Sequence, residues 1–327
     1  MSELLVLIDH SGAQPRKISL QLLAAARSVA DGLGAEVAAV WLGPGAGDAA
    51  TTLGAHGAVR VHHWDSEDAK GFVTVPQVDA LEQLVAATSP VAVLFASANH
   101  VKDVAARLAV RVGGGVITDA TGLAVEGGAL LATKEVFGGD VITTSHVATG
   151  SLPLIGIAAN AFPVEETGGS AAAVTPFEVS LSDAAHTAPV TEVVQQASAD
   201  RPDIAEAAIV VSGGRGLGDA SGFGLLEQLA DLLGAGVGAS RAATDAGWYP
   251  HRYQIGQTGR TISPTLYLGA GISGAIQHRA GMQTSQYVVA VNKDPEAPIF
   301  QIADFGVVGD LHQVVPKLIE AIAARKG

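Results

Sequence analysis

The chain has 327 residues, 48% of them hydrophobic and 16% charged, which excludes a disordered protein and is enough for about two domains with cores of their own. The mean hydropathy is +0.33, yet every apolar run is far shorter than the roughly 20 residues of a membrane-spanning helix. The absence of cysteine excludes disulfides and thiolate metal sites, and the net charge of −13 argues against a nucleic-acid-binding protein. Residues Met1–Ile8 lack the cationic segment of a secretory signal, so we expect a cytoplasmic protein that is not itself embedded in a membrane.

The first hundred residues alternate between β-rich and amphipathic segments. Short β-rich runs predict strands at Leu4–Ile8, Glu36–Trp41, Val59–Trp64 and Val91–Ala96. Between the first two, apolar residues recur at helical spacing over Ile18–Leu33 and predict an amphipathic helix. This alternation is typical of βαβ units around a parallel sheet.

Beyond the first hundred residues the pattern changes. Between Val116 and Glu166, short β-rich pieces follow one another with glycine-rich turns, which predicts added antiparallel strands. We therefore expect an α/β fold with two domains, of which the N-terminal one combines a βα-alternating parallel sheet with these antiparallel strands.

A candidate domain boundary follows the antiparallel region. It begins with small residues at Gly168–Ala173, contains one strand-like piece at Phe177–Leu181, and ends in a polar stretch at Gln195–Pro202. Linkers concentrate in segments of this composition. We therefore expect an N-terminal domain at residues 1–190 and a C-terminal domain at residues 203–327.

After the boundary the alternation of strands and helices resumes. We predict strands at Ala208–Val211, Thr265–Leu268, Tyr287–Val291 and Ile299–Ala303, and helices at Gly222–Leu233, Ile272–Gly281 and Gly309–Arg325. This pattern predicts a doubly wound C-terminal domain. The net charge of residues 203–327 is only −2, so an anionic ligand would bind there at a lower electrostatic cost than in the acidic first domain.

One glycine motif stands where a predicted strand leads into a predicted helix. Gly269–Gly274 fits G-x-G-x-x-G, whose glycines let a phosphate approach backbone N–H groups at the positive end of a helix dipole. The acidic residue usual about 20 positions later is absent, and Asn292 stands there instead. An asparagine amide can still hydrogen-bond a ribose or an adenine edge. The motif predicts a nucleotide site, with a chance match in a glycine-rich chain as the alternative.

Three more loops place polar side chains between glycines after apolar runs: Ser212–Gly218, Gly238–Arg241 and Gly256–Gly259. In the first of them, four glycines frame Arg215, which predicts a cation that reaches a phosphate or a flavin ring edge, or else a solvated arginine on a turn. Doubly wound sheets bind ligands at such successive strand ends. His278 lies just past the glycine motif, and taken by itself it is best interpreted as a surface or core histidine.

Five pieces of the C-terminal region, in order over about 90 residues, closely resemble the electron transfer flavoprotein alpha subunit, a family that includes the FixB-type proteins. They are Ser212–Gly216, Ser240–Ala243, Gly256–Gly259, Gly271–His278 and Asn292–Phe300. The N-terminal pattern and the length agree with the family, so the resemblance extends over the whole chain.

The resemblance implies that the C-terminal domain holds most of one FAD, with no metal and no catalytic residue. The implied FAD contacts are Arg215, Ser240, Arg241, Ile255, Gly256, Gln257, Thr258, Ser273, Gly274, Ala275, Ile276, Gln277, His278, Asn292, Asp310 and Leu311. Asn292 and Asp310 would lie near the adenosine end.

The resemblance also divides the remaining contacts between the two other parts of the cofactor. Ser240 and the backbone of Gly271–Gln277 would hold the pyrophosphate and the ribityl chain. Thr258, Arg241 and His278 would lie near the isoalloxazine ring.

The implied function is that of an electron carrier in fatty-acid β-oxidation, without substrate chemistry of its own. It would form a heterodimer with an electron transfer flavoprotein beta subunit, accept electrons from acyl-CoA dehydrogenases and pass them to a membrane-associated quinone reductase. Two other classes stay open on the residues alone: an NAD-dependent oxidoreductase that uses Gly269–Gly274, and a nucleotide-sensing binding protein built on the first domain.

Overall fold

The computed structural model describes residues 2–137, 141–193 and 201–326. The chain divides into two compact units, Met1–Val136 with Ile142–Val194, and Gln195–Gly327 with Phe137–Val141, and each is described by itself. Most of the polar stretch expected to be a linker, Gln195–Pro202, lies outside the described residues.

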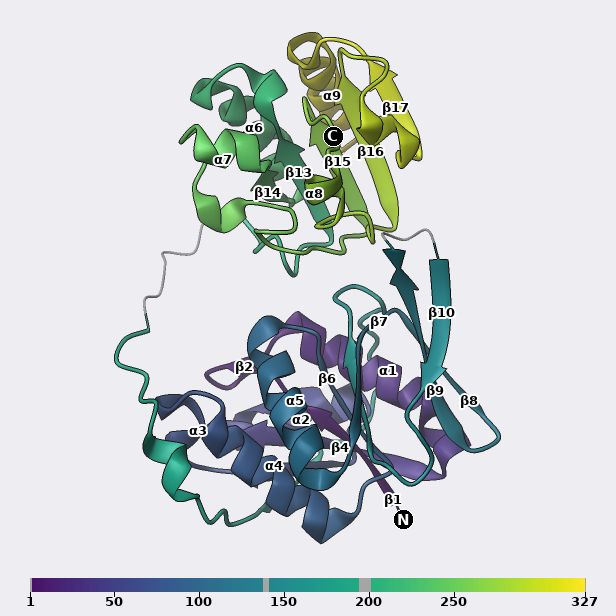
Figure 1. Cartoon of the computed structure of the whole chain (residues 1–327), viewed down its shortest axis with the longest axis vertical. Helices are drawn as coiled ribbons and strands as arrows, with labels where there is room; N and C mark the ends of the chain where they lie inside the picture. The colour runs from purple at the N-terminus through teal and green to yellow at the C-terminus, as the bar shows by residue number, and fades with distance from the viewer. Residues whose placement is uncertain (1, 138–140, 194–200, 327) are drawn as a thin grey trace. The chain divides into compact units, whose positions relative to one another are not determined.

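The first unit is built on a seven-stranded sheet in the order β12-β5-β4-β1-β6-β11-β7, in which all neighbouring strands run parallel (Figure 1). The strands are β1 (Ser2–Leu7), β4 (Ala35–Leu42), β5 (Arg60–Trp64), β6 (Ala92–Ala96), β7 (Gly115–Ala120), β11 (Pro153–Ile157) and β12 (Ala173–Pro176). The four strands predicted in the first hundred residues are confirmed and occupy the middle of this sheet.

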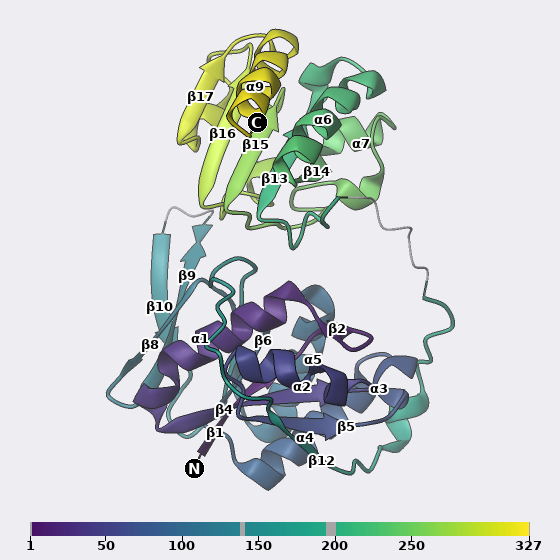
Figure 2. The same cartoon turned by 180° about the vertical axis from the view of Figure 1, so that it is seen from behind.

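Helices cover both faces of this sheet. One face carries α1 (Lys17–Leu33) and α2 (Ala46–Ala55), seen in front in Figure 2. The other carries α4 (Val75–Thr88) and α5 (Asn99–Val112), next to the short α3 (Asp68–Gly71). Successive side chains of a strand point to opposite faces, so Trp41 and Val40 enter different apolar clusters. The alternating segments of the sequence therefore predict this layered arrangement correctly.

The predicted antiparallel strands are confirmed, but they occupy only part of the region between Val116 and Glu166 for which they were predicted. A three-stranded sheet in the order β10-β9-β8 contains β8 (Gly122–Glu126), β9 (Ala129–Val136) and β10 (Val141–His146), and the β8–β9 pair is antiparallel. A small hairpin joins β2 (His10–Ser11) to β3 (Gln14–Pro15). In contrast, β7 and β11 belong to the parallel sheet.

The predicted strand at Phe177–Leu181 is wrong. The strand is β12, at Ala173–Pro176, and it pairs with β5 at the edge of the sheet. Phe177 and Leu181 instead pack with their side chains against the apolar cluster of α4 and α5. Their apolar alternation therefore reflects burial against helices, and Pro176 is tolerated in β12 because an edge strand can spare one N–H group.

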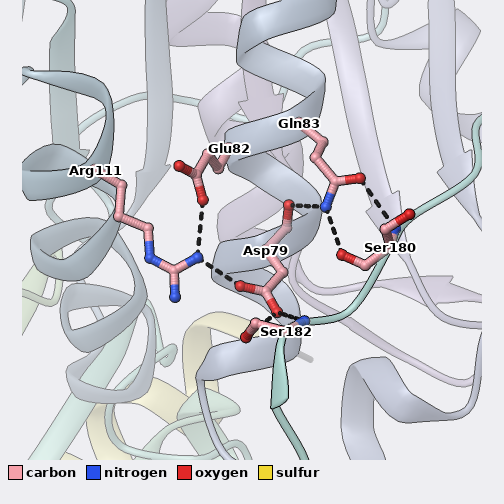
Figure 3. Close-up of polar contacts among 6 residues, drawn as sticks. All are labelled: Asp79, Glu82, Gln83, Arg111, Ser180 and Ser182. Atoms are coloured by element: carbon pink, nitrogen blue, oxygen red, sulfur yellow. Dashed lines mark hydrogen bonds and ion pairs between the residues drawn. The ribbon is translucent and has the colours of Figure 1, made fainter. Parts of the chain in front are cut away.

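Helix α4 anchors the segment that follows β12 through a buried carboxylate (Figure 3). The backbone N–H and the hydroxyl of Ser182 both donate to Asp79 Oδ2 at 2.8 Å. Arg111, on α5, donates from Nη1 to Asp79 Oδ1 at 2.5 Å and to Glu82 Oε2 at 2.8 Å. The Asp79 side chain is only 3% exposed, so these partners compensate a charge that has lost its water. A one-turn helix, η2 (Asp183–His186), follows directly.

We expect this network to stabilise the folded protein at neutral pH and to lose that stabilisation as the pH becomes acidic. Burial by itself raises the pKa of Asp79, but the hydrogen bonds from Ser182 and Arg111 outweigh burial and hold the pKa below its usual value. A lowered folded-state pKa gives a stabilisation that is complete above the unfolded pKa, about 4, and is lost as the pH falls through the folded value. We expect Asp79→Asn to lower the free energy of unfolding by about 2 kcal/mol at pH 7, and by progressively less below about pH 4.

Urea unfolding of both proteins at pH 7 and pH 3 measures this difference. Asp65→Asn is the matched control, because the Asp65 side chain is 69% exposed. A loss in Asp79→Asn that is the same at both pH values would show that the Asp79 carboxylate contributes no pH-dependent stability.

The second unit is a five-stranded parallel sheet in the order β14-β13-β15-β16-β17. Its strands are β13 (Ile209–Gly213), β14 (Gly236–Ala239), β15 (Leu266–Ala270), β16 (Tyr287–Asn292) and β17 (Phe305–Val308). Helices α6 (Phe223–Leu233) and α9 (Leu311–Lys326) cover one face (Figure 2). The other face is covered by a second apolar cluster that includes Ile255, Tyr267 and Met282. The chain thus belongs to the predicted doubly wound α/β class.

Two elements predicted in this unit differ from the structure. The predicted strand at Ile299–Ala303 is wrong: the 3₁₀ helix η6 (Pro298–Gln301) stands there, and Ile299 N donates to Ser273 O at 3.0 Å instead of joining a sheet. The predicted helix at Ile272–Gly281 is much shorter, since α8 spans only Ile276–Arg279. Asn292 Nδ2 donates to Ile272 O at 2.8 Å, so this carbonyl serves a loop contact.

Candidate functional site

The strand order of the second unit identifies where a ligand would bind. In chain order the sheet reads 2-1-3-4-5, and the connections leave in opposite directions from β13 and β15. Ligands of doubly wound sheets bind beyond the carboxyl ends of the two strands at such a switch point. The loops after β13, β14 and β15 meet there: Ser240 N donates to Gly213 O at 2.9 Å, and Gly216 N donates to Gly271 O at 2.9 Å.

The loops after β13 and β15 touch main chain to main chain. A Cβ atom added at Gly216 would lie 2.6 Å from Gly271 Cα, and one added at Gly214 would lie 2.4 Å from Gly271 O. Gly271 has a φ of +66°, in the left-handed region that residues with a side chain rarely adopt. The Arg215 loop therefore lies directly against the G-x-G-x-x-G loop, and glycine is required on both sides of this contact because a side chain would not fit.

The Gly256 loop connects β14 with α8. Ile255 N donates to Ala239 O at 2.9 Å, and Gln257 N donates to Gln277 O at 2.8 Å. A Cβ atom added at Gly256 would lie 2.8 Å from the same Gln277 oxygen. The structure therefore brings together the Gly256–Thr258 and Gly271–His278 pieces, which are separated in the sequence.

A buried amide supports the exposed Thr258 and was not identified from the sequence. Gln254 donates from Nε2 to Thr258 Oγ1 at 3.0 Å, and its Oε1 accepts from the Thr244 hydroxyl at 3.0 Å. Thr244 belongs to α7 (Arg241–Asp245), so Gln254 ties this short helix to the Gly256 loop. Arg241 Nε lies 3.2 Å from Asp245 Oδ2, one turn along α7. A polar residue just before a glycine loop is the sequence signal that could have revealed Gln254.

His278 is buried beside the loops. It is 7% exposed, so of the two possibilities left open by the sequence, a surface histidine is wrong. Its Nε2 lies 2.7 Å from the hydroxyl of Tyr267, whereas its Nδ1 is buried and has no hydrogen-bond partner in the described chain. Burial lowers the pKa of His278 to about 4, against a smaller opposing effect of the Ile255 backbone. At neutral pH the imidazole is therefore uncharged.

Asn292, at the end of β16, and Asp310, just before α9, take part in turns. Asn292 holds the G-x-G-x-x-G loop through Ile272 O, as described above, and its Oδ1 accepts from Asp294 N at 3.0 Å. Asp310 Oδ1 accepts from His312 N at 2.9 Å at the start of α9. The structure gives the Asn292 amide a loop-holding role, which the sequence did not predict.

The predicted FAD contacts differ in exposure. Those that are exposed are Arg215, Arg241, Gln257, Thr258, Ser273, Ala275, Ile276, Gln277 and Asp310. Ile255, Gly256, Gly274, His278 and Leu311 are buried, and Ser240 and Asn292 are partly buried. The Leu311 side chain belongs to the apolar cluster of α6 and α9.

These residues fit the FAD that the sequence resemblance implies. Buried polar atoms in proteins nearly always have partners, yet Ser212 Oγ, on β13, and His278 Nδ1 have none in the described chain. Around them, the exposed side chains offer two guanidinium groups, amides and hydroxyls, while Ile276 adds an apolar surface that is 66% exposed. Such a mixture suits a ligand with phosphates, hydroxyls and a flat ring system.

The first unit contains a cavity of about 300 Å³ elsewhere. It lies beyond the carboxyl ends of β1 and β6 and is lined by apolar side chains together with Asp9, His10, Lys70 and Thr74. None of the predicted FAD contacts lines this cavity. Within the residues that the structure describes, no group of three or more acidic or histidine side chains could hold a metal, and no helix is long and apolar enough to cross a membrane.

Comparison with known proteins agrees with both units. Residues 4–182 match the family model described as "Electron transfer flavoprotein domain". Residues 203–283 match the one described as "Electron transfer flavoprotein FAD-binding domain". The second match includes the site residues from Arg215 to His278 and ends before Asn292.

Relatives of similar length extend the likeness to the whole chain. The "Electron transfer flavoprotein subunit alpha" of Mycobacterium leprae is 46% identical over 100% of both chains. The protein of the same name from Syntrophomonas wolfei is 39% identical over 97% of this chain and 98% of its own. "Protein FixB" of Clostridium saccharobutylicum is 38% identical over 96% of this chain and 94% of its own. This chain therefore belongs to the electron transfer flavoprotein alpha-subunit family, whose C-terminal domain binds FAD.

Proposed function

We propose that this chain and a beta subunit form a cytoplasmic heterodimer that carries electrons from soluble dehydrogenases to a membrane-associated quinone reductase. Acyl-CoA dehydrogenases are the proposed donors, which places the protein in fatty-acid β-oxidation. The observation that carries the proposal is the meeting of three glycine loops at the switch point of the second unit, next to a buried histidine with a free ring nitrogen. Bound FAD would supply the redox chemistry, so the chain itself needs only to bind and orient the cofactor and to tune its potential.

The two parts of the chain would divide this work. We assign FAD binding to residues 203–327 and contacts with the protein partner to residues 1–190. Ser240 and the backbone of Gly271–Gln277 would hold the pyrophosphate and ribityl chain, because they are on the loops that meet at the switch point.

The remaining FAD contacts are assigned to the two ends of the cofactor. Thr258, Arg241 and His278 would lie near the isoalloxazine ring, since the Gln254 amide and α8 bring their loops together. Asn292 and Asp310 would lie near the adenosine end.

An NAD-dependent oxidoreductase is less well supported by the geometry. Such a protein would use the last residue of β16 to bind a ribose, and a carboxylate usually does this. Here the Nδ2 and Oδ1 atoms of Asn292 both make hydrogen bonds within the loops.

Co-expression with the beta subunit tests the proposed function. The purified heterodimer should show flavin absorption bands, and acid should release the FAD, since no cysteine is present for a thioether link. Catalytic amounts of an acyl-CoA dehydrogenase together with excess acyl-CoA should bleach these bands. The dehydrogenase without acyl-CoA, or acyl-CoA without the dehydrogenase, should not. A colourless heterodimer, or flavin that stays oxidised in the complete mixture, would refute the proposal.

A further inference from the structure

The cavity in the first unit lies at the switch point of the seven-stranded sheet. Strands β4 and β5 extend the sheet on one side of β1, whereas β6, β11 and β7 extend it on the other. The cavity lies beyond the carboxyl ends of β1 and β6, where Ile8 and Ala96 line it. Doubly wound sheets bind their ligands at this place, so a cavity there is a candidate ligand site.

Branched aliphatic side chains form much of the cavity wall. Val101 and Val104, on α5, are buried, whereas Val73 and Val190 are 53% and 36% exposed. An apolar group bound against Val73 and Val190 would remove them from water, which is favourable. With a volume of about 300 Å³, the cavity is at the lower end of the range for ligand pockets and would take a small molecule.

A strained turn holds one side of this wall. Val75 N donates to Val73 O at 2.7 Å around Thr74, whose φ of +60° and ψ of −57° belong to the rare and strained form of the γ-turn. A β-branched residue adopts a positive φ only where its surroundings enforce it. Here the Thr74 hydroxyl donates to Asp103 Oδ2 at 2.7 Å, and Val73 N donates to Ala188 O at 2.9 Å. Both contacts fix the turn, so this side of the cavity has a defined shape.

Lys70, on α3, brings to the cavity a positive charge that forms no ion pair within the described chain. Its Nζ donates to His10 O at 3.3 Å and lies 3.2 Å from His10 Nδ1. Burial lowers the pKa of His10, so this imidazole is uncharged at neutral pH. Asp9 and Glu67 attract the ammonium group only from beyond ion-pair distance. Asp9, which also lines the cavity, is itself paired with Arg16, whose Nε lies 3.4 Å from Asp9 Oδ1.

The start of α5 adds a partial positive charge to that of Lys70. Among the described residues no side chain caps this 14-residue helix, and its first turn contains no acidic residue. His100 and Val101, in that turn, line the cavity. A helix N-terminus favours negative charge, so α5 and Lys70 favour the same kind of ligand group. One full cation matches the single negative charge of a carboxylate better than a phosphate ester, which carries about 1.5 to 2.

We propose that this cavity binds a small carboxylic acid with an aliphatic body, whose carboxylate pairs with Lys70 while the body packs against the valines. None of the predicted FAD contacts lines the cavity, so the site is separate from the FAD site. The ligand takes no part in electron transfer, and the site goes beyond the proposed function.

Isothermal titration calorimetry of the purified heterodimer with octanoate tests the proposal. Octanamide is the matched probe, because it keeps the aliphatic chain and replaces the carboxylate with a neutral amide. We expect octanoate to bind at a single site and about tenfold more tightly than octanamide, since a hydrogen bond between charged groups is stronger than one to a neutral group. A tenfold ratio corresponds to about 1.4 kcal/mol. Octyl phosphate should bind no more tightly than octanoate.

Two variants separate the charge of the site from its apolar wall. Lys70→Met removes the charge and keeps an unbranched side chain, so octanoate should bind about tenfold more weakly while the affinity for octanamide stays the same. Ala96→Leu places a larger side chain in the cavity and should weaken the binding of both probes. Ala96 is 2% exposed, so circular dichroism must show that this variant is folded. Lys70→Met decides the question if it is not.

Lys317→Met is the matched control, because Lys317 is an exposed lysine on α9 that does not line the cavity. Its affinity for octanoate should equal that of the wild type. The proposal would be overturned by a failure of octanoate to bind, by equal affinities for octanoate and octanamide, or by octanoate binding that is unchanged in Lys70→Met. Tighter binding of octyl phosphate than of octanoate would overturn the assignment of a carboxylate.

Discussion

Replacing Gly274 with alanine is expected to weaken FAD binding by the heterodimer about thirtyfold or more. Gly274 has a φ of +78°, and an added Cβ would lie 2.4 Å from Ile299 N and 2.5 Å from Ile299 Cα. These are backbone atoms of η6, and Ile299 N also donates to Ser273 O at 3.0 Å, so the loop can relieve the clash only by giving up this hydrogen bond. Left-handed strain of about 1–2 kcal/mol together with a steric cost of about 1–3 kcal/mol gives that factor, at about 1.4 kcal/mol for each tenfold.

Titration of the FAD-free heterodimer with FAD, followed by flavin fluorescence, measures this effect. Gly247→Ala is the matched control: Gly247 has a φ of +73°, but an added Cβ there would meet nothing within 4 Å. It carries the left-handed strain without the clash and lies outside the predicted contacts. Equal dissociation constants for the two variants would show that the Gly274 turn does not shape the FAD site.

The chain expressed without its beta subunit should bind FAD at least about a hundredfold more weakly than the heterodimer does. Nine of the predicted contacts, among them Arg215, Gln257 and Ile276, are exposed in the chain without a partner. Tight small-molecule sites bury about 70–90% of their ligand, so a second chain is needed to cover the cofactor. A hundredfold difference corresponds to about 2.7 kcal/mol.

The dissociation constant of FAD should be measured for both forms in the same buffer, with gel filtration as the control for assembly. The lone chain should also fail to take electrons from an acyl-CoA dehydrogenase. A lone chain that stays monomeric, binds FAD as tightly as the heterodimer and accepts electrons at the same rate would contradict the prediction.

The sequence predicts the regular elements well because their signals are local. The apolar runs of β4 and β6 and the helical spacing over α1 are visible within one segment. Burial on both faces of the sheet accounts for the two strands, and burial of one helix face against the sheet accounts for α1. Prediction was wrong where apolar residues are buried for another reason. Phe177 and Leu181 pack on helices without forming a strand, and Ile299 is buried in a 3₁₀ turn. Apolar runs of this length do not distinguish these cases.

The candidate site was only partly visible in the sequence. Glycine loops identify Arg215, which follows β13, and Gln257, which follows the 3₁₀ helix η5 (His251–Tyr253). Their meeting point depends on strand order, which the sequence predicts only as a class. Tyr267 and Gln254 were missed because each makes its hydrogen bond with a residue on another element: Tyr267 on β15 with His278 on α8, and Gln254 with Thr244 on α7. Within a strand, a tyrosine that supports a histidine looks the same as one that fills the core.

The contact between Gly216 and Gly271 also bears on how firmly the site keeps its shape. Side chains that meet in a core can change rotamer and absorb a shift of their neighbours, but two stretches of main chain in direct contact have no rotamers to change. The spacing between these two loops is therefore set by the radii of backbone atoms and by one hydrogen bond of 2.9 Å from Gly216 N to Gly271 O. Warming or repacking the helices around the sheet should move both loops together, so the separation of the groups on either side is preserved. In the proposed carrier, whose partners would each meet the same cofactor in turn, this rigid contact would keep the FAD site in one shape at every electron transfer.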